Sequence, residues 1–595
     1  MTFPPPLNDL SPDEEKALNR VARTEAFSAG ETIFEEGDEG QSCYFIDEGQ
    51  VRIELAYEEI DSQHVLEYLE AGDILGELSL LDDRPRSAGA IADTPTETRQ
   101  VRRDDLERLA EDEPGLAMDV YHALGQHTAQ KLRATNVKLA EETPVTPTED
   151  VEALVDRATQ AQGHIQEWSE ERIQALLGDL AQSINERAEE FAEKSVKASF
   201  LGNAHDKVIK IKLGSLGIYQ SMLGGVGQGV IEEDADRGVV SWAAPVGIVF
   251  GLIPITNPIS TAAFKTLISL KSRNALILSF HHLTKELGAE YLDLVHSVLE
   301  DHGAPTNLVQ QVRKRNSRKK TEMFMQHDDV DLILATGGAS MVKAAYSSGN
   351  PAIGVGPGNA PAMIGPDADV ADAVSKVIWS KTFDNGLICG SEHNLVVPES
   401  MRDEVTAELK RQGAALLTDA EKEHFMAHSI YEKKNVFDKE LVGQAASDIL
   451  AKLGIERDGD VELIVIPADD ISEDNPLSKE KLLPLISLYT VADTEEALDV
   501  SEQLLELDGT GHTAAIHTTD DELITRYGER MPASRIIVNA PSSSGVTGLT
   551  TGLVPSLTLG CGTYGGTSTC DNVTYTHLQN VKRIAREREP EVELS

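Results

Sequence analysis

The chain has 595 residues, of which 40% are hydrophobic, and carries a formal net charge of −47. One hydrophobic core rarely serves so long a chain, so we expect two or more domains. The negative charge is spread along the sequence and argues against nucleic acid or an anionic membrane as a partner. Adaptation to high salt, where ions screen this repulsion, is one hypothesis for it.

The sequence shows no targeting or membrane segment. No window approaches the roughly 20 apolar residues that a membrane span needs, and MTFPPPLNDLSPDEEK lacks the basic start and apolar stretch of a signal peptide. We therefore expect a cytoplasmic protein. The four cysteines have no paired C-x-x-C spacing, so neither a disulfide framework nor a metal site is predicted.

The first 140 residues predict a small all-β domain that ends in a helix. Short segments of alternating polarity, separated by glycine-containing turns, are typical of a jelly-roll-like β-barrel; they cover residues 31–37, 43–49, 51–57 and 64–72. An amphipathic helix is expected from Leu116 to Leu132, because apolar residues recur there at helical spacing. The stretch 141–149, rich in Thr, Pro and acidic residues, predicts a linker.

The stretch GDILGELSLLDDRPRSAGA, residues 72–90, offers the groups that a cyclic phosphate needs. A helical turn at Gly76 would present free backbone N–H groups, Glu77 can accept a hydrogen bond from a ribose hydroxyl, and Arg86 can pair with phosphate oxygens. Residues 10–135 resemble the cyclic nucleotide-binding domain, whose phosphate-binding cassette maps onto Gly76, Glu77, Leu78, Arg86 and Ser87. Ser87 suits either cAMP or cGMP. A degenerate copy with a purely structural role is the alternative.

After residue 149, apolar runs alternate with helical patterns. The runs 246–255, 274–279, 331–337 and 351–356 are separated by expected helices at 260–272, 285–301 and 340–348. Continuous apolar strands between helices predict a parallel sheet that is covered on both faces.

Cys389, in KTFDNGLICGSEHN, is the candidate nucleophile of this second part. A thiolate that attacks an aldehyde creates an oxyanion, so the site needs an accessible cysteine, a hydrogen-bond donor and a hydride acceptor. Gly386 and Gly390 leave room around Cys389, and Asn257, which follows an apolar strand, supplies a neutral amide donor.

Five motifs carry a family resemblance in this part: PVGIVFGLIPITNPISTAAFKTLISLKSRN, LATGGASMVKAAYSSGNPAIGVGPGNAP, SKTFDNGLICGSEHN, GTGHTAAIHT and VPSLTLGCGTYGG. From about residue 150 to 595 the chain resembles the CoA-acylating aldehyde dehydrogenases, especially the aldehyde dehydrogenase half of bifunctional alcohol/aldehyde dehydrogenases. The resemblance implies an α/β aldehyde dehydrogenase fold with a Rossmann-like cofactor domain at 150–385, a catalytic domain at 386–550 and a returning oligomerisation segment at 551–595. Because the chain stops there, we expect no alcohol dehydrogenase half.

The same resemblance assigns roles to individual residues. Cys389 would be the nucleophile, and Asn257 would donate to the oxyanion together with the backbone N–H of Cys389. His512 could assist deprotonation of a thiol, with packing at a strand start as the alternative. Residues expected to bind NAD or NADP are Thr256, Ser279, Thr336, Gly337, Gly338 and Glu480.

One absence favours coenzyme A over water as the acyl acceptor. Enzymes that release a free acid use a glutamate as general base in the segment after the TGG strand and helix, yet no Asp or Glu occurs from Leu332 to Pro366. A thiol is a better nucleophile than water near neutral pH. The expected reaction converts an aldehyde, CoA and NAD(P) to acyl-CoA and reduced cofactor. A hydrolytic aldehyde dehydrogenase and a catalytically silent nucleotide sensor are the alternatives.

Other features of this part remain open in the sequence. Acetaldehyde, a short homologue and sulfoacetaldehyde all suit the motifs as substrates, and a homodimer or larger assembly is expected from the resemblance. The basic cluster 312–320 could contact the phosphates of CoA or form a solvated helix end, and Cys561 and Cys570 are expected to be structural.

Overall fold

The computed structural model describes residue 16 and residues 19–588, apart from 57–62, 83, 84, 113, 116, 119, 123, 126, 127, 129–146, 314–317, 432–434 and 458. The chain forms two compact units, Met1–Val145 and Thr146–Ser595. Among the described residues, no helix has the length and apolar character needed to cross a membrane.

The N-terminal unit contains two four-stranded antiparallel sheets, which confirms the predicted jelly-roll-like architecture. Along β3, Cys43 and Phe45 pack into one apolar cluster while Tyr44 and Ile46 pack into another, so both faces of this strand are buried. One sheet has the order β1-β8-β3-β6 and the other β2-β7-β4-β5. The strands are β1 (Arg23–Phe27), β2 (Thr32–Phe34), β3 (Ser42–Glu48), β4 (Gln50–Ala56), β5 (Gln63–Glu70), β6 (Ile74–Leu75), β7 (Gly89–Ala92) and β8 (Thr96–Arg102).

Two helices accompany these sheets, α2 (Glu77–Asp82) and α3 (Arg103–Asp112). The described residues between 114 and 128 are also helical, as the pattern predicts, whereas 129–132 lie outside the described residues. Residues 141–146 of the expected linker lie outside them too. Its last residues are helical, because α5 begins at Pro147, an imino acid suited to a first helical turn.

Helices open the second unit. They are α5 (Pro147–Ile165), α6 (Glu170–Glu186), α7 (Ala188–Ser199), α8 (Ala204–Lys212) and α9 (Ile218–Ser221). Buried Leu and Ile side chains of α5 and α6 join the large apolar core of the first parallel sheet. Arg187 interrupts the helical pattern between α6 and α7 with φ −101° and ψ 13°.

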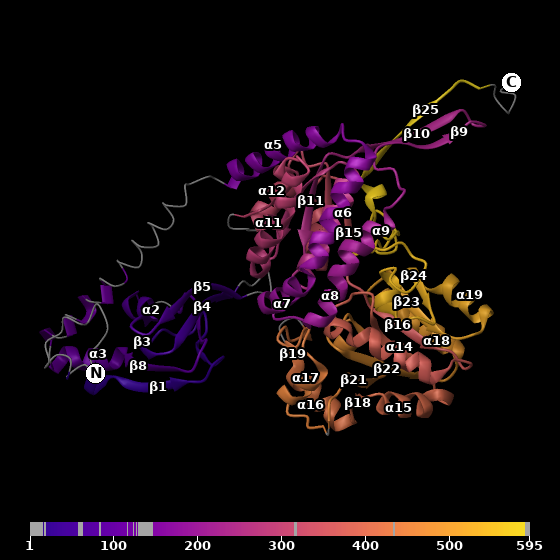
Figure 1. Cartoon of the computed structure of the whole chain (residues 1–595). Helices are drawn as coiled ribbons and strands as arrows, with labels where there is room; N and C mark the ends of the chain where they lie inside the picture. The colour runs from indigo at the N-terminus through magenta and orange to yellow at the C-terminus, as the bar shows by residue number, and fades with distance from the viewer. Residues whose placement is uncertain are drawn as a thin grey trace, which may run out of the picture. The chain divides into compact units, whose positions relative to one another are not determined.

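The predicted parallel sheet is present, with the order β13-β12-β11-β14-β15 and helices on both faces (Figure 1). Its strands are entirely or almost entirely buried, which explains their continuous apolar sequences. The strands are β11 (Ile248–Ile253), β12 (Ala275–Phe280), β13 (Val309–Gln311), β14 (Leu332–Thr336) and β15 (Ala352–Val355). The helices between them are α10 (Pro258–Lys271), α11 (Lys285–Asp301), α12 (Arg318–Met325) and α13 (Ala339–Tyr346).

A second parallel sheet of seven strands follows, with the order β18-β21-β22-β17-β16-β23-β24. It already includes β16, so the sheet changes between Val355 and Ala360, ahead of the expected boundary at residue 386. The glycine-rich segment between β15 and β16 carries the chain from one sheet to the other. The strands are β16 (Ala360–Ile364), β17 (Glu392–Pro398), β18 (Ala414–Leu416), β21 (Leu463–Ala468), β22 (Leu485–Val491), β23 (Gly511–His517) and β24 (Ala533–Val538). Their helices are α14 (Val370–Thr382), α15 (Arg402–Arg411), α16 (Asp419–Ser429), α17 (Ala446–Lys452), α18 (Thr494–Leu507), α19 (Asp521–Arg530) and α20 (Ser542–Val546).

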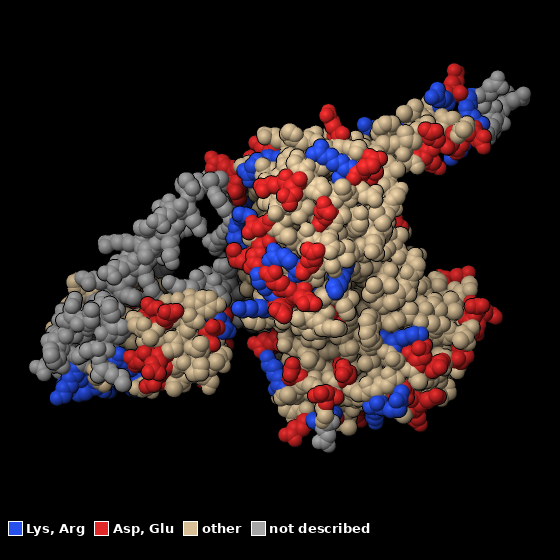
Figure 2. Space-filling view, viewed as in Figure 1, with Lys and Arg blue, Asp and Glu red and all other residues tan. Residues whose placement is uncertain are grey.

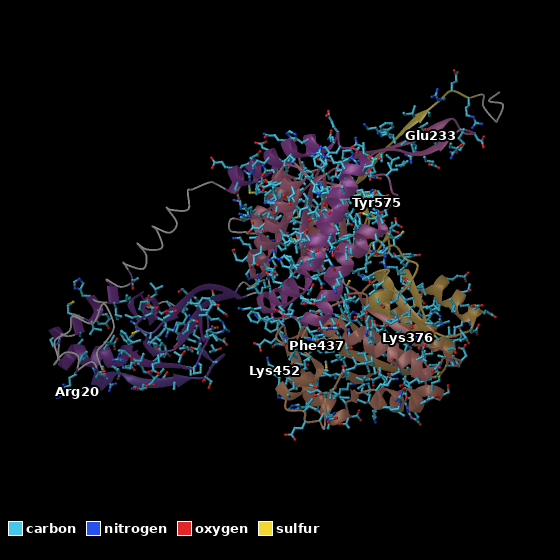
Figure 3. The ribbon with its side chains drawn as sticks, in the orientation of Figure 1. Arg20, Glu233, Lys376, Phe437, Lys452 and Tyr575 are labelled. Carbon is cyan, nitrogen blue, oxygen red and sulfur yellow. The ribbon has the colours of Figure 1, made fainter. Side chains whose placement is uncertain are left out.

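Two small antiparallel sheets complete the unit. The strands β19 (Ile430–Tyr431) and β20 (Val436–Phe437) form a pair. A three-stranded sheet joins β9 (Gly229–Asp234), β10 (Val239–Pro245) and β25 (Gln579–Ala585), and it extends away from the two parallel sheets, with Glu233 on its outer part (Figures 1 and 3). The described part of the returning segment 551–595 therefore contains a strand, β25, that pairs with β10.

Charged side chains are distributed widely over this unit. Figure 2 shows Asp and Glu side chains across the visible face with Lys and Arg side chains among them, in agreement with the spread of charge along the sequence. In the basic cluster 312–320, Lys320 is buried and paired with Asp150, and Arg318 pairs with Glu322. Both side chains therefore form ion pairs within the protein.

Candidate active site

Cys389 lies in the loop between α14 and β17, behind a tight turn. Asp384, Asn385 and Gly386 adopt left-handed backbone conformations, with φ values of 49°, 54° and 81°. Asp, Asn and Gly are the residues that tolerate this conformation best, so the DNG sequence produces the turn directly. Cys389 itself is half-buried, so its thiol is not sealed inside the core.

Glycines allow neighbouring segments to approach Cys389 closely. A Cβ atom on Gly358 would overlap the carbonyl oxygen of Cys389, and one on Gly390 would overlap the side chain of Val546. The Gly358 N–H donates to Oε1 of Glu480 at 3.0 Å. Glu480 therefore holds the glycine-rich segment against the backbone of Cys389.

Two buried lysines of α8 share one carboxylate in the turn before Cys389. Oδ2 of Asp384 accepts from Nζ of Lys207 at 2.9 Å and from Nζ of Lys210 at 2.5 Å. Asp384 is fully buried, and the side chains of Lys207 and Lys210 are only 3% and 4% exposed. Burial lowers the pKa of Lys207 to about 8, although the charge of Asp384 acts in the opposite direction. This cluster fixes α8 to the loop that carries the nucleophile.

The same cluster orients the amide of Asn257. Nζ of Lys210 donates to Oδ1 of Asn257 at 2.9 Å and to the carbonyl of Leu387 at 3.3 Å. Because an ammonium group can only donate, the amide oxygen must face Lys210, and the NH₂ group points the other way. One of its N–H bonds contacts Oγ1 of Thr256 at 3.2 Å, which leaves the second for an oxyanion. Asn257 starts α10 without capping it through its side chain, so the amide is not engaged by the helix.

The surroundings of Cys389 keep its thiol protonated at rest. Burial raises its pKa to about 12, the charge of Glu480 adds to this effect, and the Arg535 guanidinium opposes it. Arg535 is itself buried and donates to the carbonyls of His512 and Gly560 at 2.9 and 2.6 Å. The arginine therefore places a positive charge beside the nucleophile and connects it with His512.

His512 is buried and neutral. Burial lowers its pKa to about 3, and the charge of Arg535 contributes. Nδ1 lies 2.8 Å from Oγ1 of Thr513, while the buried Nε2 has no hydrogen-bond partner. A neutral imidazole with a free nitrogen can contact a substrate, but it is a weak base at this pKa.

The raised pKa of Cys389 predicts how its alkylation depends on pH. Only the thiolate reacts with iodoacetamide, so the rate at Cys389 should rise about tenfold per pH unit from pH 6 to pH 9. Mass spectrometry of the alkylated peptide measures this rate, and the peptide of the exposed Cys570 serves as an internal control. A plateau below pH 8 at Cys389 would contradict the expected result.

A second buried network beneath the nucleophile was not predicted from the sequence. Nδ1 of His393 accepts from Nζ of Lys381 at 2.9 Å and from the backbone N–H of Lys481 at 3.0 Å. Nζ of Lys381 also donates to the carbonyl of Lys481 at 2.8 Å. All three side chains are fully buried, and burial lowers the pKa of Lys381 to about 7. The sequence gives no signal for this network, because Lys381, His393 and Lys481 each stand among other polar residues.

The expected cofactor residues of the first sheet meet at one edge. Leu252 of β11 is paired with Ser279 of β12 and with Ala335 of β14, so the carboxyl ends of these strands are adjacent. Thr336 ends β14, and Gly337 and Gly338 lead into α13. Oγ1 of Thr336 is buried without a hydrogen-bond partner, so it is available to a ligand at this edge.

Thr256 and Glu480, two further residues expected to bind the cofactor, contact groups that lie close to Cys389. The carbonyl of Thr256 accepts from Nζ of Lys207 at 2.9 Å. Glu480 is engaged by Gly358, and burial raises its pKa to about 7. The open ends of the parallel strands, the glycines and the unpartnered Thr336 hydroxyl fit a dinucleotide.

In the N-terminal unit, three of the five expected nucleotide-binding residues lie together. The Arg86 guanidinium donates to the carbonyl of Gly76 at 2.8 Å and to Oγ of Ser42 at 3.2 Å, and it stacks over the Phe34 ring at 4.2 Å. Gly76 has φ 77°, and a Cβ atom there would overlap the guanidinium. Glu77 is also buried, and its charge raises the pKa of Arg86. The other two residues, Leu78 and Ser87, are exposed.

The two parallel sheets, the loop of Cys389 and the fixed amide of Asn257 are the features with which the comparisons to known proteins agree. The family model described as aldehyde dehydrogenase family matches residues 125–577, and the chain belongs to this family. Residues 24–113 match the cyclic nucleotide-binding domain. Both family resemblances seen in the sequence are thereby confirmed.

Particular relatives share the second unit. The bifunctional aldehyde-alcohol dehydrogenase AdhE of Escherichia coli K12 is 38% identical over 450 residues, which are 75% of this chain and 50% of the relative. The chain thus spans about half the length of that protein. The succinate-semialdehyde dehydrogenase (acetylating) of Clostridium kluyveri is 33% identical over 434 residues, covering 73% of this chain and 95% of the relative. The crystal structure of an acetylating aldehyde dehydrogenase from Geobacillus thermoglucosidasius superposes with a TM-score of 0.73 at 39% identity, covering 75% of this chain and 98% of that one.

Proposed function

We propose that this chain is an acylating aldehyde dehydrogenase that converts an aldehyde, CoA and NAD(P) to acyl-CoA and reduced cofactor, in either direction. The observation that carries the proposal is the amide of Asn257. Lys210 fixes its oxygen and also holds the loop of Cys389, and one N–H of the amide contacts Thr256 while the other is left for an oxyanion. The relatives named as acetylating enzymes support the same reading.

The first half of the reaction uses Cys389 and Asn257. The half-buried Cys389 thiol loses its proton to solvent, and the thiolate adds to the aldehyde carbon, so that the carbonyl oxygen becomes an oxyanion. The free N–H of Asn257 and the backbone N–H of Cys389 donate to that oxyanion. Arg535 stabilises the thiolate electrostatically, since its charge lowers the pKa of Cys389.

The cofactor residues are assigned by the same proposal. Thr336, Gly337, Gly338, Ser279 and Thr256 would hold the dinucleotide at the strand ends, and Glu480 would hold the nicotinamide ribose. A bound NAD(P) would supply the hydride acceptor that oxidises the adduct on Cys389 to a thioester. The buried carboxyl of Glu480 keeps the glycine-rich segment beside the thioester through Gly358.

The second half of the reaction transfers the acyl group to CoA. The CoA thiol attacks the thioester carbon, Asn257 again stabilises the oxyanion, and Cys389 leaves and takes up the proton that the CoA thiol releases, in keeping with the raised pKa of Cys389. His512 contributes its unpartnered Nε2 as a hydrogen-bond acceptor for the incoming thiol. With a pKa of about 3, it orients that proton rather than retaining it at neutral pH.

Release of a free acid is the second candidate activity, and Glu480 is the observation in its favour. The charge of Glu480 raises the pKa of Cys389, and the pKa of Glu480 itself, about 7, would allow it to accept a proton from water. Its contact with the Gly358 N–H argues instead for a positioning role.

The dependence of NADH formation on CoA separates these activities. With aldehyde and NAD, we expect NADH formation to be at least tenfold faster when CoA is present, because a thiol is the better acceptor. Absorbance at 340 nm measures the rate, and mass spectrometry identifies the product. Equal rates without CoA, with free acid as product, would establish the hydrolytic activity. No NADH under either condition would indicate a silent sensor.

We also propose that cAMP or cGMP binds the N-terminal unit and regulates the enzyme. The buried pair Glu77 and Arg86 beside Gly76 supports this, since a phosphate could replace the carbonyl of Gly76 as the acceptor for Arg86. Regulation further requires that the nucleotide bind two states of the enzyme unequally.

Replacing Arg86 by alanine tests nucleotide binding. Loss of charge-assisted hydrogen bonds of about 2 kcal/mol should weaken the affinity for cAMP or cGMP about 30-fold in calorimetry of the full chain. Arg108→Ala is the matched control in the same unit, because that side chain is 67% exposed. Absence of binding heat for both nucleotides in the wild type would leave the unit a structural role.

Assembly and location belong to the same proposal. A homodimer or larger assembly would use the three-stranded sheet, whose exposed apolar residues include Trp242 and Ile584. A cytoplasmic location is proposed because Cys389 must stay reduced to act as the nucleophile.

A further inference from the structure

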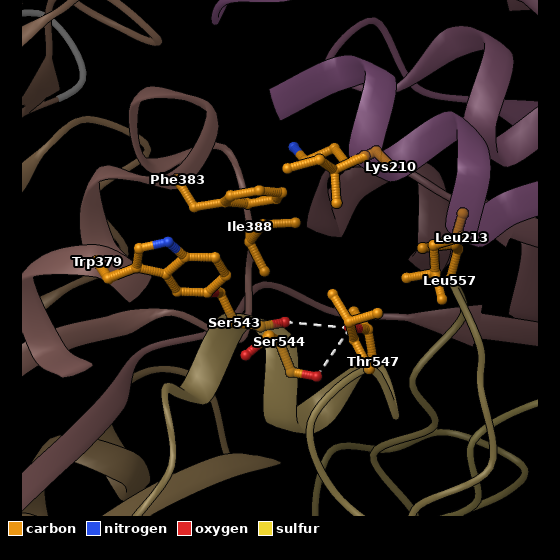
Figure 4. A pocket seen from close by; sticks show the side chains of 11 residues that line it. Lys210, Leu213, Trp379, Phe383, Ile388, Ser543, Ser544, Thr547 and Leu557 are labelled. Atoms are coloured by element: carbon orange, nitrogen blue, oxygen red, sulfur yellow. Dashed lines mark hydrogen bonds between the residues drawn. The ribbon is translucent and has the colours of Figure 1, made fainter. Parts of the chain in front are cut away.

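Lys381 is a fully buried lysine near the end of α14, and the proposed reaction gives it no role. It lies halfway along the chain between Trp379 and Phe383, whose rings stack with centroids 5.2 Å apart. Figure 4 shows both rings at the wall of one pocket, which Lys381 does not line. Because residues two positions apart point to nearly opposite sides of a helix, Lys381 faces the protein interior instead.

The ammonium group of Lys381 forms no ion pair with any residue that the structure describes. Its Nζ donates to Nδ1 of His393 at 2.9 Å and to the carbonyl of Lys481 at 2.8 Å. Burial holds the pKa of His393 well below its ordinary value, so the imidazole is neutral and accepts this hydrogen bond. A buried charge without a carboxylate partner is costly, so the nearest anions must stabilise it over a longer distance.

Two carboxyl groups supply negative charge to Lys381. Burial lowers the pKa of Lys381 to about 7, and the charges of Glu392 and Glu480 oppose this effect. Glu392 is fully buried, and its Oε1 accepts from the backbone N–H of Ser542 at 2.8 Å. Glu480 is half-buried, and its Oε1 accepts from the Gly358 N–H at 3.0 Å. Of the two carboxyl groups, Glu480 is therefore the one that a ligand can reach.

The charged and titratable groups around Glu480 act in both directions. Burial raises its pKa to about 7, and the charge of Asp508, which accepts from the backbone N–H of Glu480 at 2.9 Å, adds to this effect. The positive charges of Lys381 and Lys481 lower the pKa of Glu480. The Cys389 thiol, with a pKa of about 12, is uncharged at rest. Loss of Lys381 would therefore leave Glu480 protonated up to a higher pH.

From these contacts we infer that Lys381 is a positioning residue for Glu480, which holds the segment of Glu480 in place and keeps its carboxyl group ionised. The contact with the carbonyl of Lys481, the next residue in the chain, ties this segment to α14. An ionised carboxylate only accepts hydrogen bonds, so it suits the two hydroxyl groups of a ribose better than a protonated carboxyl group does. This inference rests on the proposed function, in which Glu480 holds the nicotinamide ribose.

Lys381→Gln tests the inference on the full-length protein. The amide can still donate hydrogen bonds, while the charge is lost. Calorimetry from about pH 6 to pH 9 should show that the wild-type affinity for NAD rises as Glu480 ionises near pH 7. In Lys381→Gln this rise should move up by about one pH unit, and the affinity at pH 7 should fall about fivefold, because the protonated carboxyl group is favoured.

Two further variants accompany this test. Lys381→Met also removes the charge but places no polar group in the interior, so it replaces Lys381→Gln if that variant does not fold, and the same shift is expected. Lys376→Gln is the matched control: Lys376 lies on the same helix but pairs with Asp372 at the surface, so no shift is expected.

A double substitution shows whether Lys381 acts through Glu480. When Lys381→Gln is added to Glu480→Gln, the NAD affinity should change less than about twofold, because the carboxyl group on which Lys381 acts is gone. Additive losses, an unchanged pH profile in the Lys381 variants, or an equal shift in Lys376→Gln would overturn the inference and leave the proposed function standing. A wild-type protein that binds no NAD at any pH would overturn the proposed function itself.

Discussion

Replacing Cys389 by alanine is expected to lower kcat/KM for CoA-dependent aldehyde oxidation by about 10⁴-fold or more, as for other enzymes that lose a covalent nucleophile. The amide of Asn257 and the charge of Arg535 would stay in place, but no atom remains to bond the aldehyde carbon. The NAD affinity should change little, because none of the expected dinucleotide residues lies on the loop that carries Cys389. Rates of NADH formation and calorimetry with NAD measure the two quantities separately.

The other cysteines provide controls for this substitution. Cys570 is exposed and Cys561 is buried among the apolar residues of the second sheet. Cys570→Ala should retain nearly full activity, since its side chain contacts neither the nucleophile loop nor the strand ends. Substantial activity in Cys389→Ala, or a comparable loss in Cys570→Ala, would remove Cys389 from the mechanism.

Continuous apolar strands made the architecture of the second unit predictable. The segments around β11, β12, β14 and β15 have no alternation, and a strand buried on both faces needs none. The local backbone around the proposed nucleophile and amide donor could also be anticipated, because DNG and NP fix its shape around Cys389 and Asn257. Local sequence was therefore enough to propose these two residues as the reacting groups.

The residues that hold those groups could not be anticipated. Lys207, Lys210 and Asp384 are far apart in sequence, and a lysine on a helix normally indicates a solvated face. Only the tertiary fold places the two lysines on one buried carboxylate. The sequence does not show the role of Gly358 either. A side chain at this position is excluded by the carbonyl oxygen of Cys389, a residue that is distant in the sequence.

Asp384→Asn is expected to lower the free energy of unfolding by about 3–5 kcal/mol, because it leaves two buried ammonium groups without their counter-ion. Asparagine tolerates the left-handed backbone at this position, where φ is 49°, so the substitution removes the charge and little else. Urea unfolding of the full chain, followed for the second unit by the fluorescence of Trp379 and the other tryptophans, measures the loss. Asp372→Asn on α14 is the matched control: its partner is the surface residue Lys376, so a loss below about 0.5 kcal/mol is expected.

The pH dependence of Asp384→Asn distinguishes a lost counter-ion from a lost hydrogen bond. Burial already holds the pKa of Lys207 at about 8, below the 10.5 of a free lysine, and removal of Asp384 should lower it further. Between the folded and unfolded pKa values the unfolded chain binds more protons, so the stability of the variant should rise with pH up to about 10. Folded wild-type Lys207 loses its proton only near pH 8, so the deficit should narrow as the pH rises to about 8 and stay constant above it. A deficit that does not narrow between about pH 6 and 8 would mean that Lys207 is not the source of the penalty. Activity adds an independent readout, because Lys210 orients Asn257: kcat should fall by more than the affinity for NAD if the carboxylate acts through the oxyanion donor.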